Sequence, residues 1–173
     1  MRRRQALAAI ASAGLAGGGL WVAQHGLPGG SDGASLPVRV ETLDAPGSSA
    51  GEALVPTPGT VTVVDLFATW CAPCKKQLDV LNAVRGEYDD VSFVSVTNER
   101  VGDSFTRADI ADWWRRHDGH WTVGLEPGGE ILKAFGATGL PHVAIADSDG
   151  RLVFEHGGLL EAATLRSQLA EVV

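Results

Sequence analysis

The chain has 173 residues, of which 45% are hydrophobic, and its formal net charge at pH 7 is −7. This length suits one compact domain with its own core and is too short for two ordinary domains. The acidic balance argues against general binding to nucleic acid, which needs clustered Lys and Arg side chains to contact phosphates.

Residues 1–23 have the pattern of an export signal or membrane anchor. Three arginines at positions 2–4 precede an uncharged run rich in Ala, Gly and Leu, as the basic and apolar parts of an export signal do. The paired arginines loosely resemble a twin-arginine signal. Trp21-Val22-Ala23 is a poor cleavage site, so both cleavage and retention as an anchor stay open. We therefore expect an exported, extracytoplasmic protein that is either membrane-anchored or secreted.

Residues 24–35 are rich in Gly, Pro and Ser without periodicity, which predicts a flexible linker. Strand and helix patterns alternate through the remaining segment, residues 36–173. The expected elements are a leading hairpin over 38–51, a strand over 60–67, a helix from the cysteines to about 88, a strand over 91–97, helices over 107–117 and 129–135, a hairpin over 143–156 and a final helix over 161–172. This order predicts an α/β domain with a central mixed sheet flanked by helices.

The chain has two cysteines, Cys71 and Cys74. Two cysteines cannot build a disulfide framework or close a four-ligand zinc site, so the pair is either redox-active or half of a metal site. The strand before the pair and the helix after it place Cys71 at a helix N-terminus, where unpaired N–H groups stabilise a thiolate. Cys71 is therefore the expected nucleophile, and Cys74, one turn later, is expected to resolve the mixed disulfide.

The stretch 65–75 carries Trp-Cys-Ala-Pro-Cys at positions 70–74 and resembles the active-site stretch of thioredoxins. The leading hairpin, the insert between residues 97 and 136 and the Gly-Leu-Pro at 139–141 are similar to the exported TlpA/ResA-type branch of that superfamily. The resemblance covers about residues 36–173. It implies a thioredoxin fold with an N-terminal hairpin and an extra helix–strand insert before a cis-proline loop.

The resemblance also implies roles for individual residues. Pro141 would be the cis-proline that faces the cysteines, and the backbone of Leu140 would pair with an extended substrate segment. Asp65 would be buried beneath the cysteines, where it could take and return the proton of Cys74. The residues implied to contact the substrate are Trp70, Ala72, Pro73 and Leu140.

Two departures from the family pattern concern this site. Gln77 stands where TlpA-like proteins usually carry Glu. The strand over 91–97 has no lysine that could pair with Asp65, which leaves the proton role of Asp65 open.

The implied activity is disulfide exchange with extracytoplasmic proteins, such as reduction of apo-cytochrome c or other secreted thiols, or oxidation of new disulfides. It would need a redox partner that donates or accepts electrons, and no cofactor besides the redox-active Cys71–Cys74 disulfide. The membrane would be reached through the N-terminal segment. The alternative is a thioredoxin-fold copper chaperone, because soft thiolates favour Cu(I) and His142 could join the two cysteines.

Overall fold

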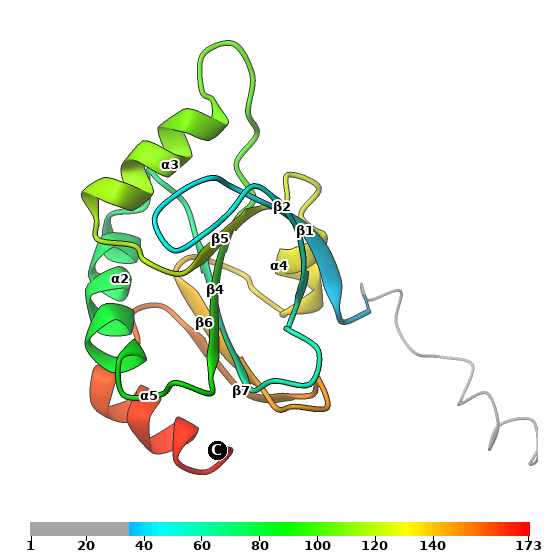
Figure 1. The fold of residues 1–173 in the computed structure, drawn as a ribbon, viewed down its shortest axis with the longest axis vertical. Coiled ribbons are helices and arrows are strands. Elements are labelled where there is room, and N and C mark those ends of the chain that lie inside the picture. Colours follow the sequence, from blue (N-terminus) through cyan, green and yellow to red (C-terminus); the bar gives the residue numbers. More distant parts are fainter. Residues whose placement is uncertain (1–34) are drawn as a thin grey trace, which may run out of the picture. The chain divides into compact units, whose positions relative to one another are not determined.

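The computed structural model of the chain describes residues 35–173, which lie in one compact unit (Figure 1). The expected export signal at 1–23 and nearly all of the expected linker at 24–35 lie outside the described residues. Among the described residues, no helix combines the length and the hydropathy that a membrane span requires.

A seven-stranded mixed sheet forms the centre of this unit, in the order β2-β1-β5-β4-β3-β6-β7. The strands are β1 (Val38–Thr42), β2 (Gly51–Val55), β3 (Thr62–Phe67), β4 (Ser92–Thr97), β5 (Thr122–Leu125), β6 (His142–Ala146) and β7 (Leu152–Gly157). Strand β3 pairs in parallel with β4 and antiparallel with β6. All of its residues are buried, as its β-branched and apolar composition predicts for a central strand.

Four helices cover the two faces of the sheet. They are α2 (Ala72–Arg85), α3 (Arg107–Arg116), α4 (Glu130–Ala134) and α5 (Ala162–Leu169). In Figure 1, α2, α3 and α5 lie on one side of the sheet and α4 lies on the other. Helix α3 and strand β5 form the extra helix–strand insert, and β1 with β2 forms the leading hairpin, so both expected additions are present.

The alternation of side chains along β3 divides the core into two parts. Val63 and Phe67 join the core under α2, α3 and α5, whereas Val64 and Leu66 join the core under α4. Since successive side chains of a strand point to opposite faces, Asp65 lies on the α2 face with Val63 and Phe67. The central strand thereby places a carboxyl group below the start of α2.

The loop between β1 and β2 packs closely on the segment that precedes β5. Gly47 has φ +76°, and a Cβ at this position would collide with the backbone of His120, so glycine is required here. Trp114 is fully buried, and its Nε1 donates a hydrogen bond to the carbonyl of Pro46 at 3.1 Å. Trp113 is also buried and stacks on Phe67, so both tryptophans of α3 belong to the core.

Candidate active site

Cys71 and Cys74 form a disulfide at the start of α2. Cys71 is the residue before the first helical position, with extended backbone angles (φ −83°, ψ 106°), and Pro73 lies in the first turn. Pro73 fits there because the first N–H groups of a helix have no partner within the helix. Cys71 is 4% exposed and Cys74 is 0% exposed, so an incoming thiolate can reach Cys71 more readily than Cys74.

The residues expected to contact a substrate surround the disulfide and are accessible. Trp70, with 74% of its side chain exposed, precedes Cys71 directly, and both Ala72 and Pro73 are exposed. Leu140 is half-buried.

Pro141 is placed beside the segment that carries the cysteines by the pairing of β3 with β6. The Leu140–Pro141 peptide bond is cis, as the resemblance implied. His142, the next residue, pairs with Leu66 near the end of β3, so Pro141 lies where the chain leaves β3 for the cysteines. The Pro141 carbonyl accepts a hydrogen bond from the N–H of Gly158 at 2.8 Å, which ties this loop to the end of β7.

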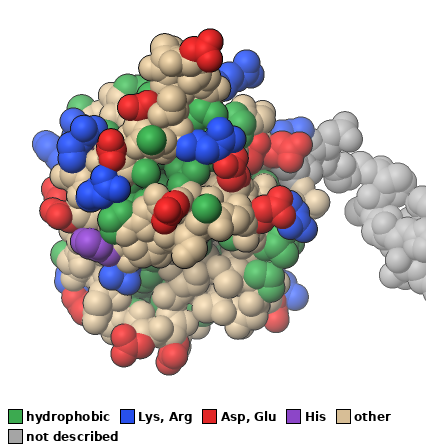
Figure 2. Space-filling view, turned by 45° about the horizontal axis from the view of Figure 1, so that its top comes forward, with side chains coloured by type: hydrophobic (Ala, Val, Ile, Leu, Met, Phe, Trp, Pro, Cys, Tyr) green, Lys and Arg blue, Asp and Glu red, His purple; other side chains and the backbone are tan. Residues whose placement is uncertain are grey.

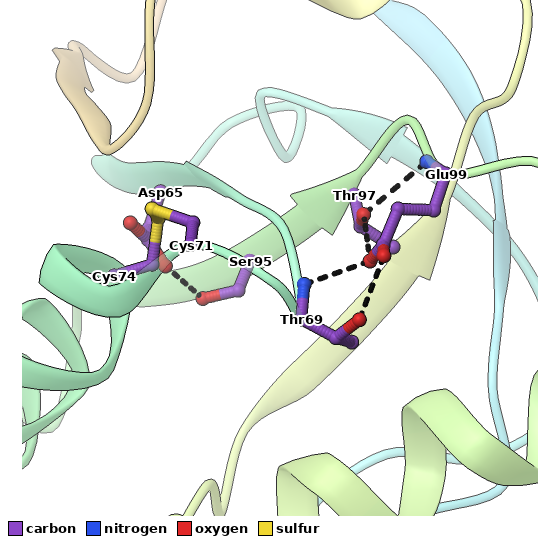
Figure 3. Close-up of a disulfide and its surroundings, with 7 residues drawn as sticks. All are labelled: Asp65, Thr69, Cys71, Cys74, Ser95, Thr97 and Glu99. Carbon is purple, nitrogen blue, oxygen red and sulfur yellow. Dashed lines mark hydrogen bonds between the residues drawn. A yellow bond between two sulfur atoms is a disulfide. The ribbon is translucent and has the colours of Figure 1, made fainter.

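Asp65 is 1% exposed and projects from β3 toward the disulfide (Figure 3). Its neighbour in the parallel register is Ser95 on β4, whose hydroxyl donates a hydrogen bond to Asp65 Oδ2 at 2.8 Å. Burial raises the pKa of Asp65 to about 7, against the hydrogen bond from Ser95, which lowers it. A carboxyl group with this pKa changes its protonation state readily near neutral pH, which a proton carrier requires.

Glu99 holds the loop that leads to the disulfide. Its carboxylate accepts hydrogen bonds from the backbone N–H of Thr69 at 2.8 Å and from the Thr69 hydroxyl at 2.7 Å. The hydroxyl of Thr97, at the end of β4, donates a third bond to Glu99 at 3.0 Å. In Figure 3 this cluster lies on the other side of Ser95 from Asp65 and the disulfide. Glu99 therefore fixes the backbone two residues before Cys71.

His142 is not brought together with the two sulfur atoms. It begins β6, where Ala144 joins the α4 core while Val143 and Ile145 join the α2 core, so alternation directs the His142 side chain to the α4 face. Burial lowers the pKa of His142, and the groups that influence it are Phe135, Glu155 and His156. Among residues 35–173, no three His, Cys, Asp and Glu side chains are grouped as a metal site. The geometry thus gives no support to a copper site that combines His142 with the cysteines.

Sequence reasoning missed three residues of this region, namely Ser95, Trp121 and Glu99. The signal for Ser95 was present, because a polar residue inside a buried strand needs a partner and Asp65 lies on the neighbouring strand. Trp121 donates from its indole Nε1 to the Ser95 hydroxyl at 2.9 Å. Glu99 follows the end of β4 in an irregular segment, where the sequence alone does not reveal which N–H groups a carboxylate will meet.

The fold and the disulfide at the start of α2 define a thioredoxin-superfamily protein of the TlpA/ResA type. The chain belongs to the Redoxin family, whose model matches residues 35–169. A similar curated protein is the thiol-disulfide oxidoreductase ResA of Bacillus thuringiensis subsp. konkukian, which is 24% identical over 116 residues. The match covers 66% of this chain and 64% of ResA, so the chain spans slightly less than two thirds of that relative's length.

Solved structures confirm the thioredoxin-like fold. StoA from Bacillus subtilis superposes with a TM-score of 0.62 at 19% identity, over 78% of this chain and 98% of StoA. A putative thiol:disulfide interchange protein DsbE from Chlorobium tepidum gives a TM-score of 0.63 at 22% identity, over 80% of this chain and 96% of DsbE. At these identities the similarity establishes the fold, which agrees with the one expected from the sequence.

Proposed function

We propose that this protein is a thiol–disulfide oxidoreductase that exchanges disulfides with protein substrates through Cys71 and Cys74. The observation that carries the proposal is the disulfide at the start of α2, with the more exposed of the two cysteines at the helix N-terminus. When this disulfide is reduced, the unpaired N–H groups of the first helical turn stabilise the Cys71 thiolate. The names of the relatives, which include thiol-disulfide oxidoreductase ResA, support the same class of reaction.

The proposed exchange conserves electrons and protons at each step. The Cys71 thiolate attacks a substrate disulfide, one substrate sulfur leaves as a thiolate, and Cys71 becomes joined to the other. Cys74 then loses its proton to the Asp65 carboxylate and attacks the Cys71 sulfur, which releases the second substrate thiolate. The substrate is reduced by two electrons, and Cys71 and Cys74 are oxidised to the disulfide.

The cycle closes through a dithiol redox partner that runs these steps in reverse. A thiolate of this donor attacks Cys71, and the bond between Cys71 and Cys74 breaks. The leaving Cys74 sulfur receives the proton from Asp65, and the second donor thiolate releases Cys71. The donor becomes a disulfide. Whether the protein mainly reduces or oxidises its substrates depends on the reduction potential of the pair, for which 30 mV corresponds to about 1.4 kcal/mol.

The exposed surface at the disulfide supports a protein as the substrate. Trp70 offers a large, exposed aromatic side chain directly beside Cys71, and buried aromatic groups dominate contacts between proteins. Ala72 and Pro73, which follow Cys71, are exposed as well, so this surface offers apolar contact to a polypeptide. Figure 2 shows one face of the molecule, on which acidic and basic side chains are interspersed with exposed hydrophobic ones.

We further propose that the exchange takes place outside the cytoplasm. The basic and apolar pattern of residues 1–23 supports export. Compartments outside the cytoplasm are also those in which protein disulfides persist and need exchange.

Two substitutions test the proposed reaction. Cys71→Ser should abolish reduction of insulin disulfides by dithiothreitol above the uncatalysed rate, because the nucleophile is gone. Cys74→Ser should leave Cys71 joined to its substrate, so that mixed disulfides accumulate in cells and separate on a non-reducing gel. Full activity of the Cys71→Ser variant, or no trapped mixed disulfide with Cys74→Ser, would contradict the proposal.

A further inference from the structure

Three side chains form a continuous buried hydrogen-bond chain beneath the disulfide. The Trp121 indole N–H donates to the Ser95 hydroxyl oxygen at 2.9 Å, and the Ser95 hydroxyl donates to Asp65 Oδ2 at 2.8 Å. Asp65 is 1%, Ser95 0% and Trp121 4% exposed. The chain crosses three neighbouring strands, because Asp65 lies on β3, Ser95 on β4 and Trp121 directly before β5.

The chemistry of the three groups fixes the direction of these hydrogen bonds. An indole N–H is only a donor, so the Ser95 oxygen must accept from Trp121. The Ser95 hydroxyl proton is then directed to its other neighbour, the Asp65 carboxylate. Each bond in such a chain polarises the next, so the indole makes Ser95 a stronger donor than an isolated hydroxyl would be. The arrangement favours the charged form of Asp65.

Among the neighbouring elements that the structure describes, no cationic side chain pairs with the Asp65 carboxylate. Strand β4 presents Ser95, and strand β6 presents Val143 opposite Asp65. Helix α2 supplies the Cys71–Cys74 disulfide, and its two lysines at positions 75 and 76 are exposed to solvent. The remaining basic residue of α2, Arg85, lies over the Trp121 ring, with its Cζ 5.8 Å from the ring centroid, and makes no ion pair with Asp65 among the described residues. The titratable residue of β6, His142, belongs to the α4 face of the sheet. Ser95 is thus the polar group whose hydrogen bond offsets the cost of burying the charged Asp65 carboxylate.

We propose that Ser95 and Trp121 are positioning residues that set the protonation equilibrium of Asp65 during disulfide exchange. This inference rests on the proposed function, in which Asp65 takes the proton of Cys74 and returns it. Ser95 acts through its hydrogen bond to the carboxylate, and Trp121 acts by orienting and polarising Ser95. With both bonds in place Asp65 is ionised often enough near neutral pH to accept the proton. Without them burial keeps it protonated.

The test compares Ser95→Ala, Trp121→Phe and Trp114→Phe in the full chain. Trp114 is the matched control, because its buried indole N–H also donates a single hydrogen bond, to Pro46, and its ring packs edge-to-face on Trp121. The titration of Asp65 is followed by the ¹³C chemical shift of its carboxyl group in reduced protein. The pH profile of insulin reduction is measured in parallel.

Ser95→Ala should move the Asp65 titration to higher pH by about one unit, since a hydrogen bond to a charged group is lost. Trp121→Phe should move it in the same direction by less, Ser95→Thr should restore most of the parent value, and Trp114→Phe should leave it unchanged. The rising limb of the insulin-reduction profile should shift with the titration.

A parent-like titration in both Ser95→Ala and Trp121→Phe would overturn the proposal. An equal shift in Trp114→Phe would also overturn it, because the effect would then be general to the core. The carboxyl titration does not depend on activity, so it tests this proposal even if Cys71→Ser shows that the proposed exchange reaction is wrong. Trp121→Phe provides the decisive result if Ser95→Ala does not fold.

Discussion

Glu99 holds Thr69 through both its backbone N–H and its hydroxyl, although the two residues are 30 positions apart in the sequence. Thr69 lies two residues before Cys71 and one before the exposed Trp70. A single carboxylate just after the end of β4 thus restrains the segment that presents both the disulfide and the aromatic side chain beside it.

Glu99→Ala should destabilise this loop and the protein. The substitution leaves the N–H and hydroxyl of Thr69 and the hydroxyl of Thr97 without their acceptor, at a cost of about 1–3 kcal/mol in the free energy of unfolding. The exchange of the Thr69 amide hydrogen should become faster. Urea unfolding and hydrogen exchange measure the two effects. Thr69→Val is the matched control, because it removes only the hydroxyl and should cost less. Unchanged amide exchange in Glu99→Ala would show that the carboxylate does not restrain the loop.

Asp65→Asn should stabilise the protein increasingly as the pH rises from about 4 to 7. The folded-state pKa of Asp65, about 7, is raised above the ordinary value of 3.8 by burial, so stability is present at low pH and is lost as the pH rises through this window. The gain from Asn should reach roughly 4 kcal/mol at most above pH 7. Urea unfolding at pH 4 and pH 8 measures it, with the exposed Asp79→Asn on α2 as the control.

An equal effect of Asp65→Asn on the free energy of unfolding at both pH values would show that folding does not raise the pKa of Asp65. The same variant should reduce insulin disulfides more slowly than the parent protein, because an amide cannot accept the proton of Cys74.

Trp70→Ala should impair exchange with protein substrates while leaving the fold intact. Trp70 is 74% exposed, so its truncation should change the free energy of unfolding by less than about 0.5 kcal/mol. Loss of an aromatic contact with a polypeptide should lower kcat/KM for insulin reduction about tenfold, which corresponds to about 1.4 kcal/mol. Oxidation of a small dithiol should continue at the parent rate. Val153→Ala, which truncates an exposed side chain on β7, should change neither rate. Equal losses for insulin and for the small dithiol would contradict a role in protein contact.

Gln77→Met should weaken the attachment between α2 and the segment before α5. Gln77 is fully buried, and its Oε1 accepts a hydrogen bond from the N–H of Leu160 at 2.8 Å. Methionine has a similar size but leaves this buried N–H without its acceptor, which costs about 1–3 kcal/mol. Part of this cost is offset, because methionine also removes the Gln77 amide nitrogen, a buried donor with no partner among the described residues. Gln168→Met on the half-exposed side of α5 is the control, and urea unfolding compares the two. Equal stability of both variants would show that this hydrogen bond contributes no more than the unpaired amide nitrogen of Gln77 costs.

The sequence alone predicted the central parts of this fold because local patterns determine them. The β-branched and apolar residues at 60–67 indicated a strand buried on both faces, and every residue of β3 is buried. The spacing of the two cysteines, with proline between them after a buried strand, indicated a redox pair at a helix start, and the disulfide forms there. The resemblance to TlpA/ResA-type proteins supplied the insert and the cis-proline, both of which are present.

The neighbours of the site were decided by the tertiary structure. His142 follows Pro141 directly in the sequence and was expected near the sulfurs, yet strand alternation directs it to the α4 face. Ser95, Trp121 and Glu99 lie far from the cysteines in the chain and come to the site through the pairing of β3 with β4 and of β4 with β5. The two cysteines and the order of their chemical roles could be inferred from the short stretch at 65–75. The groups that hold and protonate them depend on strand register and on the face to which each side chain points, and these are properties of the assembled sheet.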